Sequence, residues 1–275
     1  MSSRYRLREL QTTLTKALLP LVPNAAKEAM LLLQDHLGCD ELYLLTHPDE
    51  EIENVEALFA KLRRRMENEP LEYITNKVSF YGEEFYVDSG ALIPRPETEL
   101  LVDEVKKHVA SDSRICFCEV GVGSGIISIM LAKHFPNATF IATDISSKAL
   151  AVTQENLKRH NLEDRITLHQ ANLLDGIADD IDYLVSNPPY IQNDFSLETN
   201  LSYEPQNALF GGEKGSEIIE ALLDETLKRG INFFSCEIGY DQKDTITQYL
   251  ANKPYKKLAF YKDYSGFDRG FTLEL

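Results

Sequence analysis

The sequence predicts an α/β chain in which a small all-helical domain at the amino terminus precedes a larger domain built on a parallel sheet. Residues 1–75 carry apolar residues at helical spacing almost throughout. From Arg114 onward, strand-like and helix-like runs alternate, which is typical of a parallel sheet covered by helices on both faces. The length of 275 residues exceeds the common domain size of about 100–150 residues, so two domains are expected.

Amphipathic helices are expected throughout the helical domain, residues 1–75. The first presents leucines at i, i+3, i+7 and i+11, namely Leu7, Leu10, Leu14 and Leu18. The second ends at Gly38, because glycine is favoured just past a helix end. Its apolar residues are Ala26, Met30, Leu33 and Leu37. A longer helix follows Pro48, and its expected inner face is Ile52, Val55, Phe59, Leu62 and Met66.

An aromatic-rich segment connects the two domains. Between Val78 and Asp88 the pattern changes to strand-like alternation, which predicts a β-hairpin that turns near Gly82 to Glu84. We assign residues 76–92 to this connector and residues 93–275 to the larger domain. The runs of the larger domain are, in chain order, Ile115–Val120, Ile126–His134, Thr139–Thr143, Ser147–His160, Ile166–His169, Tyr183–Ser186, Ser216–Arg229 and Ile231–Ile238.

The charge balance is strongly acidic. There are 28 Lys and Arg residues against 44 Asp and Glu residues, a net charge of −16. Both domains share the excess, because residues 1–75 contribute 9 basic and 13 acidic side chains, or −4, and the rest contributes −12. Such a surface repels phosphate backbones, so the composition argues against a nucleic-acid substrate.

Nothing in the sequence indicates export, a membrane span or a metal site. The amino terminus lacks the apolar core of a signal peptide, and the longest apolar run is far shorter than the roughly 20 residues of a membrane span. The histidines have no recurrent ligand spacing. The four cysteines fit neither a zinc ribbon nor a disulfide scaffold, so we interpret them as buried thiols: Cys39, Cys116, Cys118 and Cys236. We expect a cytoplasmic protein.

A glycine-rich turn follows the first strand of the larger domain. It runs from Glu119 to Gly125 and spaces its glycines as G-x-G-x-G. A dinucleotide fingerprint needs a third glycine at position 126, where Ile126 stands. Glycines let the backbone approach a ligand closely, although a purely structural turn has the same composition. The segment resembles motif I of the S-adenosylmethionine-dependent methyltransferases of the seven-stranded class.

Asp144 closes the second strand, at the edge of the sheet where ligands of doubly wound folds bind. A carboxylate there can accept hydrogen bonds from both ribose hydroxyls of an adenosine, which is the role that the resemblance implies. The alternative is an amino-terminal cap for the helix that begins at Ser146 or Ser147. Both roles are compatible.

The sequence Asn187-Pro188-Pro189-Tyr190 follows the strand Tyr183–Ser186. The prolines remove backbone donors and hold the preceding residues in extended geometry, so the turn presents acceptors. The carboxamide oxygen of Asn187 and the carbonyl of Pro188 could together accept both hydrogens of a planar amino group. Tyr190 could stack on its flat face. The alternative is a proline-rich loop that merely ends a strand.

Acceptors on these hydrogens favour the pyramidal form of the nitrogen, which attacks an electrophilic methyl group. These hydrogen bonds strengthen as the reaction approaches its transition state, so no general base is strictly required. The motif resembles methyltransferases that act on adenine N6, guanine N2 or protein glutamine, and by itself it does not choose among these acceptors.

The rest of the chain resembles the release-factor glutamine methyltransferases (PrmC/HemK). The similar segments occur in the family's order and span nearly the whole chain: Pro70–Ile74, Phe80–Gly82, Ile93–Glu99, Tyr203–Pro205, Ala208–Gly212, Glu237–Gly239, Lys262-Asp263 and Gly266–Arg269. The resemblance implies a Rossmann-like seven-stranded methyltransferase domain. It also implies N5-methylation of the glutamine in the Gly-Gly-Gln motif of class 1 peptide-chain release factors, with the helical domain contacting the release factor.

The resemblance also implies roles for individual residues. The glutamine would be held by Asn187, Pro188, Pro189 and Tyr190, and the reaction would be catalysed by Asn187, Pro188 and Tyr190. The residues expected to bind S-adenosyl-L-methionine are Glu119, Gly121, Val122, Gly123, Ser124, Gly125, Asp144, Asn172 and Asn187. Two positions depart from the family pattern, since Asp is commoner at Glu119 and usual at Asn172. The sequence assigns no chemical role to Arg95, Glu97, Phe80 or Tyr81.

Two other functions remain open on the sequence. A nucleic-acid amino-methyltransferase would share the Asn-Pro-Pro-Tyr chemistry, but it would need a basic groove and strongly salt-dependent binding. A scaffold protein could keep the fold without activity, although the intact motif at Asn187–Tyr190 argues against that alternative.

Overall fold

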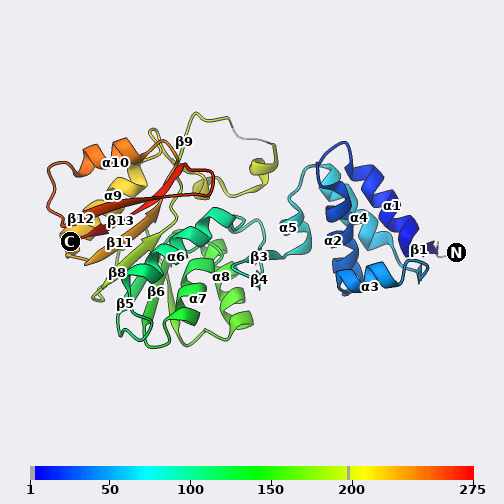
Figure 1. The fold of residues 1–275 in the computed structure, drawn as a ribbon, viewed down its shortest axis with the longest axis horizontal. Coiled ribbons are helices and arrows are strands. Elements are labelled where there is room, and N and C mark those ends of the chain that lie inside the picture. The colour runs from blue at the N-terminus through cyan, green and yellow to red at the C-terminus, as the bar shows by residue number, and fades with distance from the viewer. Residues whose placement is uncertain (1–3, 197–198) are drawn as a thin grey trace. The chain divides into compact units, whose positions relative to one another are not determined.

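The computed structural model describes residues 4–196 and 199–275 (Figure 1). The chain forms two compact units, each with its own core. The first unit comprises the residues up to Asn76 and a short segment that ends at Tyr203, and the second comprises the remainder. Within the described residues, none of the helices combines the length and the apolar character that crossing a membrane requires.

The first unit is mostly helical. Its elements are β1 (Tyr5–Arg6), α1 (Leu7–Leu18), α2 (Ala25–Leu37), α3 (Glu41–Thr46), β2 (Glu51–Ile52), α4 (Glu56–Met66), α5 (Leu71–Thr75) and the 3-10 helix η2 (Thr199–Tyr203). The leucine face predicted for the first helix is confirmed, because all four leucines are buried in one core cluster. Helix α2 ends at Gly38, whose φ of 64° is the left-handed geometry that glycine tolerates, as predicted.

Parts of the predicted inner faces are wrong. In α2 the fully buried face also includes Ala25, Ala29 and Leu32, whereas Ala26 is exposed. The helix predicted after Pro48 begins only at Glu56, because Ile52 pairs with β1 and Asn54 adopts a positive φ of 58°. As a result Met66 is 45% exposed, and Leu58 with Leu62 supplies the buried face of α4.

The predicted hairpin is present and belongs to the second unit. Strands β3 (Val78–Phe80) and β4 (Glu83–Phe85) pair antiparallel. The turn lies at Tyr81 and Gly82, slightly before the expected position, and both residues have positive φ, 55° and 79°. This combination is typical of a two-residue hairpin turn. The rings of Phe80 and Phe85 are buried in a core cluster of the sheet, so both are packing residues.

A seven-stranded sheet forms the centre of the second unit, as the resemblance implied (Figure 1). Its strand order is β12-β13-β11-β8-β5-β6-β7. The pairs from β11 through β7 are parallel, and β13 lies antiparallel between β11 and β12. The strands are β5 (Cys116–Val120), β6 (Thr139–Asp144), β7 (Ile166–Gln170), β8 (Tyr183–Ser186), β11 (Phe233–Glu237), β12 (Lys257–Lys262) and β13 (Asp268–Glu274).

Helices cover both faces of this sheet, which confirms the prediction from the alternating runs. One core cluster includes residues of α6 (Glu99–His108), α7 (Ile126–His134) and α8 (Ser147–His160). The other includes residues of α9 (Glu217–Arg229) and α10 (Lys243–Leu250). The remaining elements are η1 (Pro96–Thr98), β9 (Ile191–Gln192), η3 (Gln206–Ala208) and β10 (Phe210–Gly212). Of the four cysteines, Cys118 and Cys236 are buried, whereas Cys39 and Cys116 are only partly so.

The strand order creates a switch point at the centre of the sheet. From β5 the chain proceeds to β6 and β7 on one side, and then returns to place β8 and β11 on the other side. Loops that leave neighbouring strands in opposite directions open a crevice at the carboxyl ends of those strands. The turns after β5, β6 and β8 therefore meet at one edge of the sheet.

Candidate functional site

The glycine turn between β5 and α7 forms one wall of the site. Gly121, Gly123 and Gly125 have φ values of 74°, 56° and 83°, which residues other than glycine rarely adopt. The amides of Gly121 and Val122 donate hydrogen bonds to the carbonyl of Thr143 at 2.8 and 3.0 Å. The turn is thereby fixed to the end of β6, with its backbone open toward a ligand.

Asp144, the last residue of β6, connects this turn to the start of α8. Its two carboxylate oxygens accept one backbone hydrogen bond each, from Gly123 at 3.0 Å and from Ser146 at 2.8 Å. Burial raises the pKa of Asp144, and these hydrogen bonds oppose that rise. The helix cap is Ser146, whose hydroxyl accepts from Ala149. Asp144 is thus not the cap of α8, and each of its oxygens keeps a lone pair for a ligand.

Glu119 lies at the carboxyl half of β5 and is 1% exposed. One of its oxygens accepts hydrogen bonds from both the amide and the hydroxyl of Ser128. Burial raises the pKa of Glu119 to about 8, against the opposing effect of these two donors. The residue lines the cavity, so a cationic group placed there would favour its ionised form.

The turn after β8 forms the opposite wall. The hydroxyl of Ser186 donates to the carbonyl of Val120 at 2.7 Å, which ties the end of β8 to the end of β5. Asn187 donates from Nδ2 to the hydroxyl of Thr98 at 3.0 Å. Within the described part of the chain, no hydrogen bond occupies the carboxamide oxygen of Asn187 or the carbonyl of Pro188. These are the two acceptors that the sequence predicted.

The structure places Tyr190 beside the end of β11. Its hydroxyl donates to Glu237 at 3.3 Å, and its ring packs against the core cluster beneath α9 and α10. Burial raises the pKa of Tyr190. Pro189 lines the cavity, and Tyr190 is not among the residues that line it. The stacking role of Tyr190 therefore stays a prediction.

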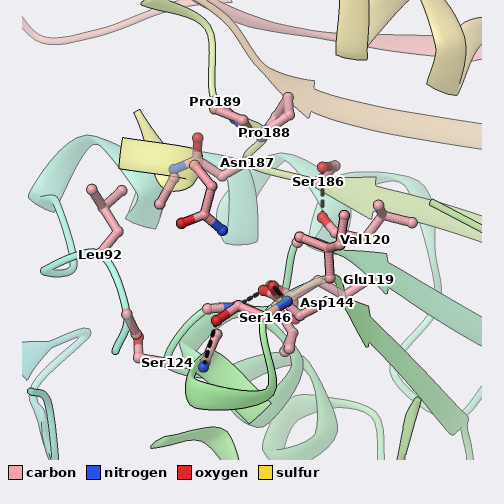
Figure 2. Close-up of a pocket in the computed structure, with 18 of the residues that line it drawn as sticks. Leu92, Glu119, Val120, Ser124, Asp144, Ser146, Ser186, Asn187, Pro188 and Pro189 are labelled. Atoms are coloured by element: carbon pink, nitrogen blue, oxygen red, sulfur yellow. Dashed lines mark hydrogen bonds between the residues drawn. The ribbon is translucent and has the colours of Figure 1, made fainter. Parts of the chain in front are cut away.

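Between these walls lies a cavity of about 310 Å³, within the usual range of small-molecule sites. Figure 2 shows Asn187, Pro188 and Pro189 on one side and Asp144 with Ser146 on the other. Predicted site residues that line the cavity are Glu119, Gly121, Val122, Gly123, Ser124, Asp144, Asn172, Asn187, Pro188 and Pro189. Gly125 lies behind this lining, at the start of α7.

Two buried groups near the cavity had no predicted role. Glu204 is 4% exposed, accepts a hydrogen bond from the amide of Ile93, and pairs with Arg95 at 2.6 Å. Glu237 ends β11 and accepts from Thr98 at 2.8 Å. Arg95 and Thr98 lie in the segment after Pro94, which the resemblance had singled out, and both line the cavity. Only the fold reveals their acidic partners, which follow more than a hundred residues later.

Comparisons with known proteins show which families this chain resembles. The chain matches the PrmC N-terminal domain over residues 7–75 and the methyltransferase small domain over residues 95–204. A release factor glutamine methyltransferase of Clostridium botulinum is 36% identical over 253 residues, which cover 88% of this chain and 89% of that protein. The corresponding protein of Koribacter versatilis is 38% identical over 240 residues, covering 84% and 85%.

Solved structures share the fold at lower identity. The catalytic domain of human METTL16, in complex with a hairpin of the MAT2A 3′ untranslated region, superposes with a TM-score of 0.59 at 14% identity. That similarity covers 82% of this chain and 84% of the other. A ribosomal protein L11 methylase from Lactobacillus delbrueckii gives a TM-score of 0.50 at 23% identity, covering 68% and 83%. At these identities the similarity shows the fold alone.

Proposed function

Because the chain belongs to the release factor glutamine methyltransferase family, we propose that it methylates the side-chain nitrogen (N5) of the glutamine in the Gly-Gly-Gln motif of class 1 peptide-chain release factors. The methyl donor would be S-adenosyl-L-methionine, and the reaction would take place in the cytoplasm. The observation that carries the proposal is the position of two unoccupied acceptors, on Asn187 and Pro188, across one cavity from Asp144.

The cavity suits the adenosine part of this cofactor. Asp144 is an anionic acceptor with a free lone pair on each oxygen, which matches the two hydroxyls of a ribose. Ile145 lines the same wall and is 60% exposed, so it offers an apolar surface to an adenine ring. We propose that Gly121 to Gly125, Asp144, Asn172 and Glu119 hold the cofactor, with Glu119 accepting from a cationic part of it. Bound there, the cofactor supplies an electrophilic methyl group.

We propose that Asn187 and Pro188 act on the substrate nitrogen. The carboxamide oxygen of Asn187 and the carbonyl of Pro188 would each accept one hydrogen of the glutamine amide. Because these bonds strengthen as the nitrogen becomes pyramidal, they stabilise the transition state more than the ground state. Pro188 and Pro189 hold the turn rigidly, which keeps the two acceptors at a fixed spacing. The nitrogen loses its extra proton after methylation, without a dedicated base.

The first unit is proposed to contact the release factor. The match of residues 7–75 to the PrmC N-terminal domain supports this role, since the same chain is similar to release factor glutamine methyltransferases over most of its length. The catalytic cavity would contact only the glutamine side chain, so a separate binding surface would account for selection of the release factor.

The proposal is tested with a panel of methyl acceptors. The protein is incubated with labelled S-adenosylmethionine and either unmethylated release factor, double-stranded DNA or RNA. We expect label on the release factor and none on the nucleic acids. Label on DNA or RNA alone would favour the amino-methyltransferase of nucleic acids, which shares the acceptor chemistry of Asn187.

The variant Asn187→Ala tests in the same assay whether the acceptor on Asn187 contributes to catalysis. We expect turnover to fall by about 100-fold, the cost of removing one positioned group that acts on a developing charge. The dissociation constant for S-adenosylhomocysteine, measured by calorimetry, should stay within about threefold, since the lost acceptor acts on the substrate. Equal losses in turnover and affinity would mean that Asn187 mainly holds the cofactor.

A further inference from the structure

We propose that Thr98 and Glu237 are positioning residues for methyl transfer, which orient the carboxamide of Asn187 so that its oxygen faces the substrate amide. This inference deepens the proposed function and rests on it. The relevant residues come from three distant parts of the sequence. Thr98 ends η1, Asn187 follows β8, and Glu237 ends β11, and they meet beside the cavity.

The hydrogen bonds form one continuous chain. Asn187 donates from Nδ2 to Oγ1 of Thr98 at 3.0 Å, and Oγ1 of Thr98 donates to Oε2 of Glu237 at 2.8 Å. Thr98 and Glu237 are each 1% exposed, so water does not compete for these bonds. Tyr190 completes the environment of Glu237 by donating to its other carboxylate oxygen at 3.3 Å.

When Glu237 is ionised, the hydrogen bonds that connect it to Thr98 and Asn187 have only one possible order of donors and acceptors. A carboxylate only accepts hydrogen bonds, so the single hydroxyl proton of Thr98 must point at it. The oxygen of Thr98 can then only accept from Asn187, and within Asn187 only the NH2 group can donate. The NH2 group is therefore turned toward Thr98, and the carboxamide oxygen stays free for the cavity that Asn187 lines.

When Glu237 is protonated, the order of donors and acceptors in these hydrogen bonds is no longer fixed. The neutral acid can donate its proton to Thr98, and the hydroxyl of Thr98 can then donate to the oxygen of Asn187. The carboxamide would then rotate and present its NH2 group to the substrate amide, which needs an acceptor. Ionisation of Glu237 is thus coupled to which end of Asn187 faces the cavity.

The groups around Glu237 set the pH at which this change occurs. Burial raises the pKa of Glu237 to about 7, while the donors Thr98 and Tyr190 and the charge of Arg269 oppose the rise. Arg269 is itself paired with Asp263 at 2.9 Å, and Glu97 adds a repelling charge. The neighbours Tyr261 and Cys236 are neutral, because burial raises the pKa of both.

Two substitutions at Thr98 test the geometry. Thr98→Val keeps the shape and removes the hydroxyl, whereas Thr98→Ser keeps the hydroxyl. With wild-type release factor as acceptor, we expect Thr98→Val to lower kcat at least about tenfold while the affinity for S-adenosylhomocysteine stays within about twofold. Thr98→Ser should restore kcat to within about threefold of the wild type.

The matched control is Thr226→Val. Thr226 is also fully buried, and its hydroxyl donates to the carbonyl of Leu222 within α9, away from the cavity lining. Its kcat should equal that of the wild type. Wild-type turnover by Thr98→Val, or equal losses in Thr98→Val and Thr226→Val, would overturn the proposal.

The pH dependence separates positioning from a merely structural role. In the wild type, the single-turnover rate should rise about tenfold from pH 6 to pH 8, as a group with a pKa of about 7 ionises. In Glu237→Gln the amide oxygen can still accept from Thr98, but the group cannot titrate. We expect this variant to lose the acidic limb of the profile, and a retained limb would contradict the proposal.

A measurement without substrate distinguishes failure of this inference from failure of the proposed function. In the complex with S-adenosylhomocysteine, NMR can follow the Glu237 carboxyl carbon and the Asn187 side-chain amide as the pH is varied. We expect both signals to titrate with one midpoint near pH 7, and the amide signal to lose this response in Thr98→Val. Independent titration would refute the coupling even if the protein methylates release factors.

Discussion

At the scale of single residues, Asp144 is the most direct test of the cofactor site. Its carboxylate holds the amides of Gly123 and Ser146 and keeps two free lone pairs toward the cavity. Replacing it by alanine removes two charge-assisted acceptors for a ribose, each worth about 1.5–3 kcal/mol. We predict that Asp144→Ala raises the dissociation constant for S-adenosylhomocysteine by at least about 100-fold, measured by calorimetry.

Asp164→Ala is the control for this prediction. Asp164 is exposed and does not line the cavity, so its removal should leave the affinity unchanged. If Asp144→Ala also binds with wild-type affinity, Asp144 serves only to shape the turn between β6 and α8.

The raised pKa of Glu119 should make the stability of the folded protein depend on pH. Its pKa is raised by burial to about 8, from 4.5 as its ordinary value. The folded state therefore binds the proton more tightly than the unfolded state, and this contribution to stability is present at low pH and lost as the pH rises from about 4.5 to about 8. The loss is at most about 1.4 kcal/mol for each pH unit.

The variant Glu119→Gln removes this titration and keeps an acceptor for Ser128. We predict that the melting temperature of the variant, relative to the wild type, rises between pH 5 and pH 8 and levels off above pH 8, in the absence of cofactor. Thermal unfolding monitored by fluorescence measures it. A difference that stays constant across this range would show that Glu119 does not titrate there.

At the scale of elements, the glycine turn before α7 depends on one crowded position. A Cβ at Gly125 would lie 2.8 Å from Cγ2 of Thr153, and Thr153 is held by a hydrogen bond to the carbonyl of Gly123. Gly125 also has a positive φ of 83°. We predict that Gly125→Ala costs about 2–5 kcal/mol of unfolding free energy, from backbone strain and overpacking together.

Gly230→Ala isolates the backbone part of this cost. Gly230 ends α9 with a φ of 68°, and a Cβ there would meet no atom within 4 Å. Its substitution should cost only about 1–2 kcal/mol. Urea unfolding compares the two variants, and equal losses would mean that Thr153 moves away without penalty.

The sequence predicts elements well where the pattern is local. The buried leucines of α1 and the Gly38 terminus of α2 follow from helical spacing and glycine geometry. The pattern fails where the chain makes a distant contact. Ile52 looked like a helical position, yet it pairs with Tyr5 in a two-stranded sheet, and this contact delays the start of α4.

The candidate site shows the same limit. The glycines, Asp144 and Asn187 were predictable because each ends or follows a strand, and the carboxyl ends of parallel strands meet at one edge of the sheet. The bond between Thr98 and Glu237 joins residues 139 positions apart, so no local pattern indicates it. The hydrogen bond from Tyr190 to Glu237 is likewise not indicated by any local pattern, because Glu237 lies on another strand.

At the scale of the whole molecule, the net charge of −16 bears on whether the protein binds nucleic acids. Both units carry a net negative charge, which repels a phosphate backbone. We predict that double-stranded DNA binds with a dissociation constant weaker than about 10⁻⁴ M at physiological salt. Fluorescence anisotropy of a labelled duplex measures it, and tight binding that weakens steeply with salt would contradict the prediction.

The central claim is the transfer of a methyl group to one nitrogen of one glutamine. The most direct measurement is fragmentation mass spectrometry of an unmethylated class 1 release factor after incubation with the protein and isotopically labelled S-adenosylmethionine. We predict a single labelled methyl group on the side chain of the glutamine in the Gly-Gly-Gln motif, formed about 100-fold more slowly with Asn187→Ala. A methyl group on another residue of the release factor, or an unmodified glutamine under conditions where the protein turns over its cofactor, would contradict the account.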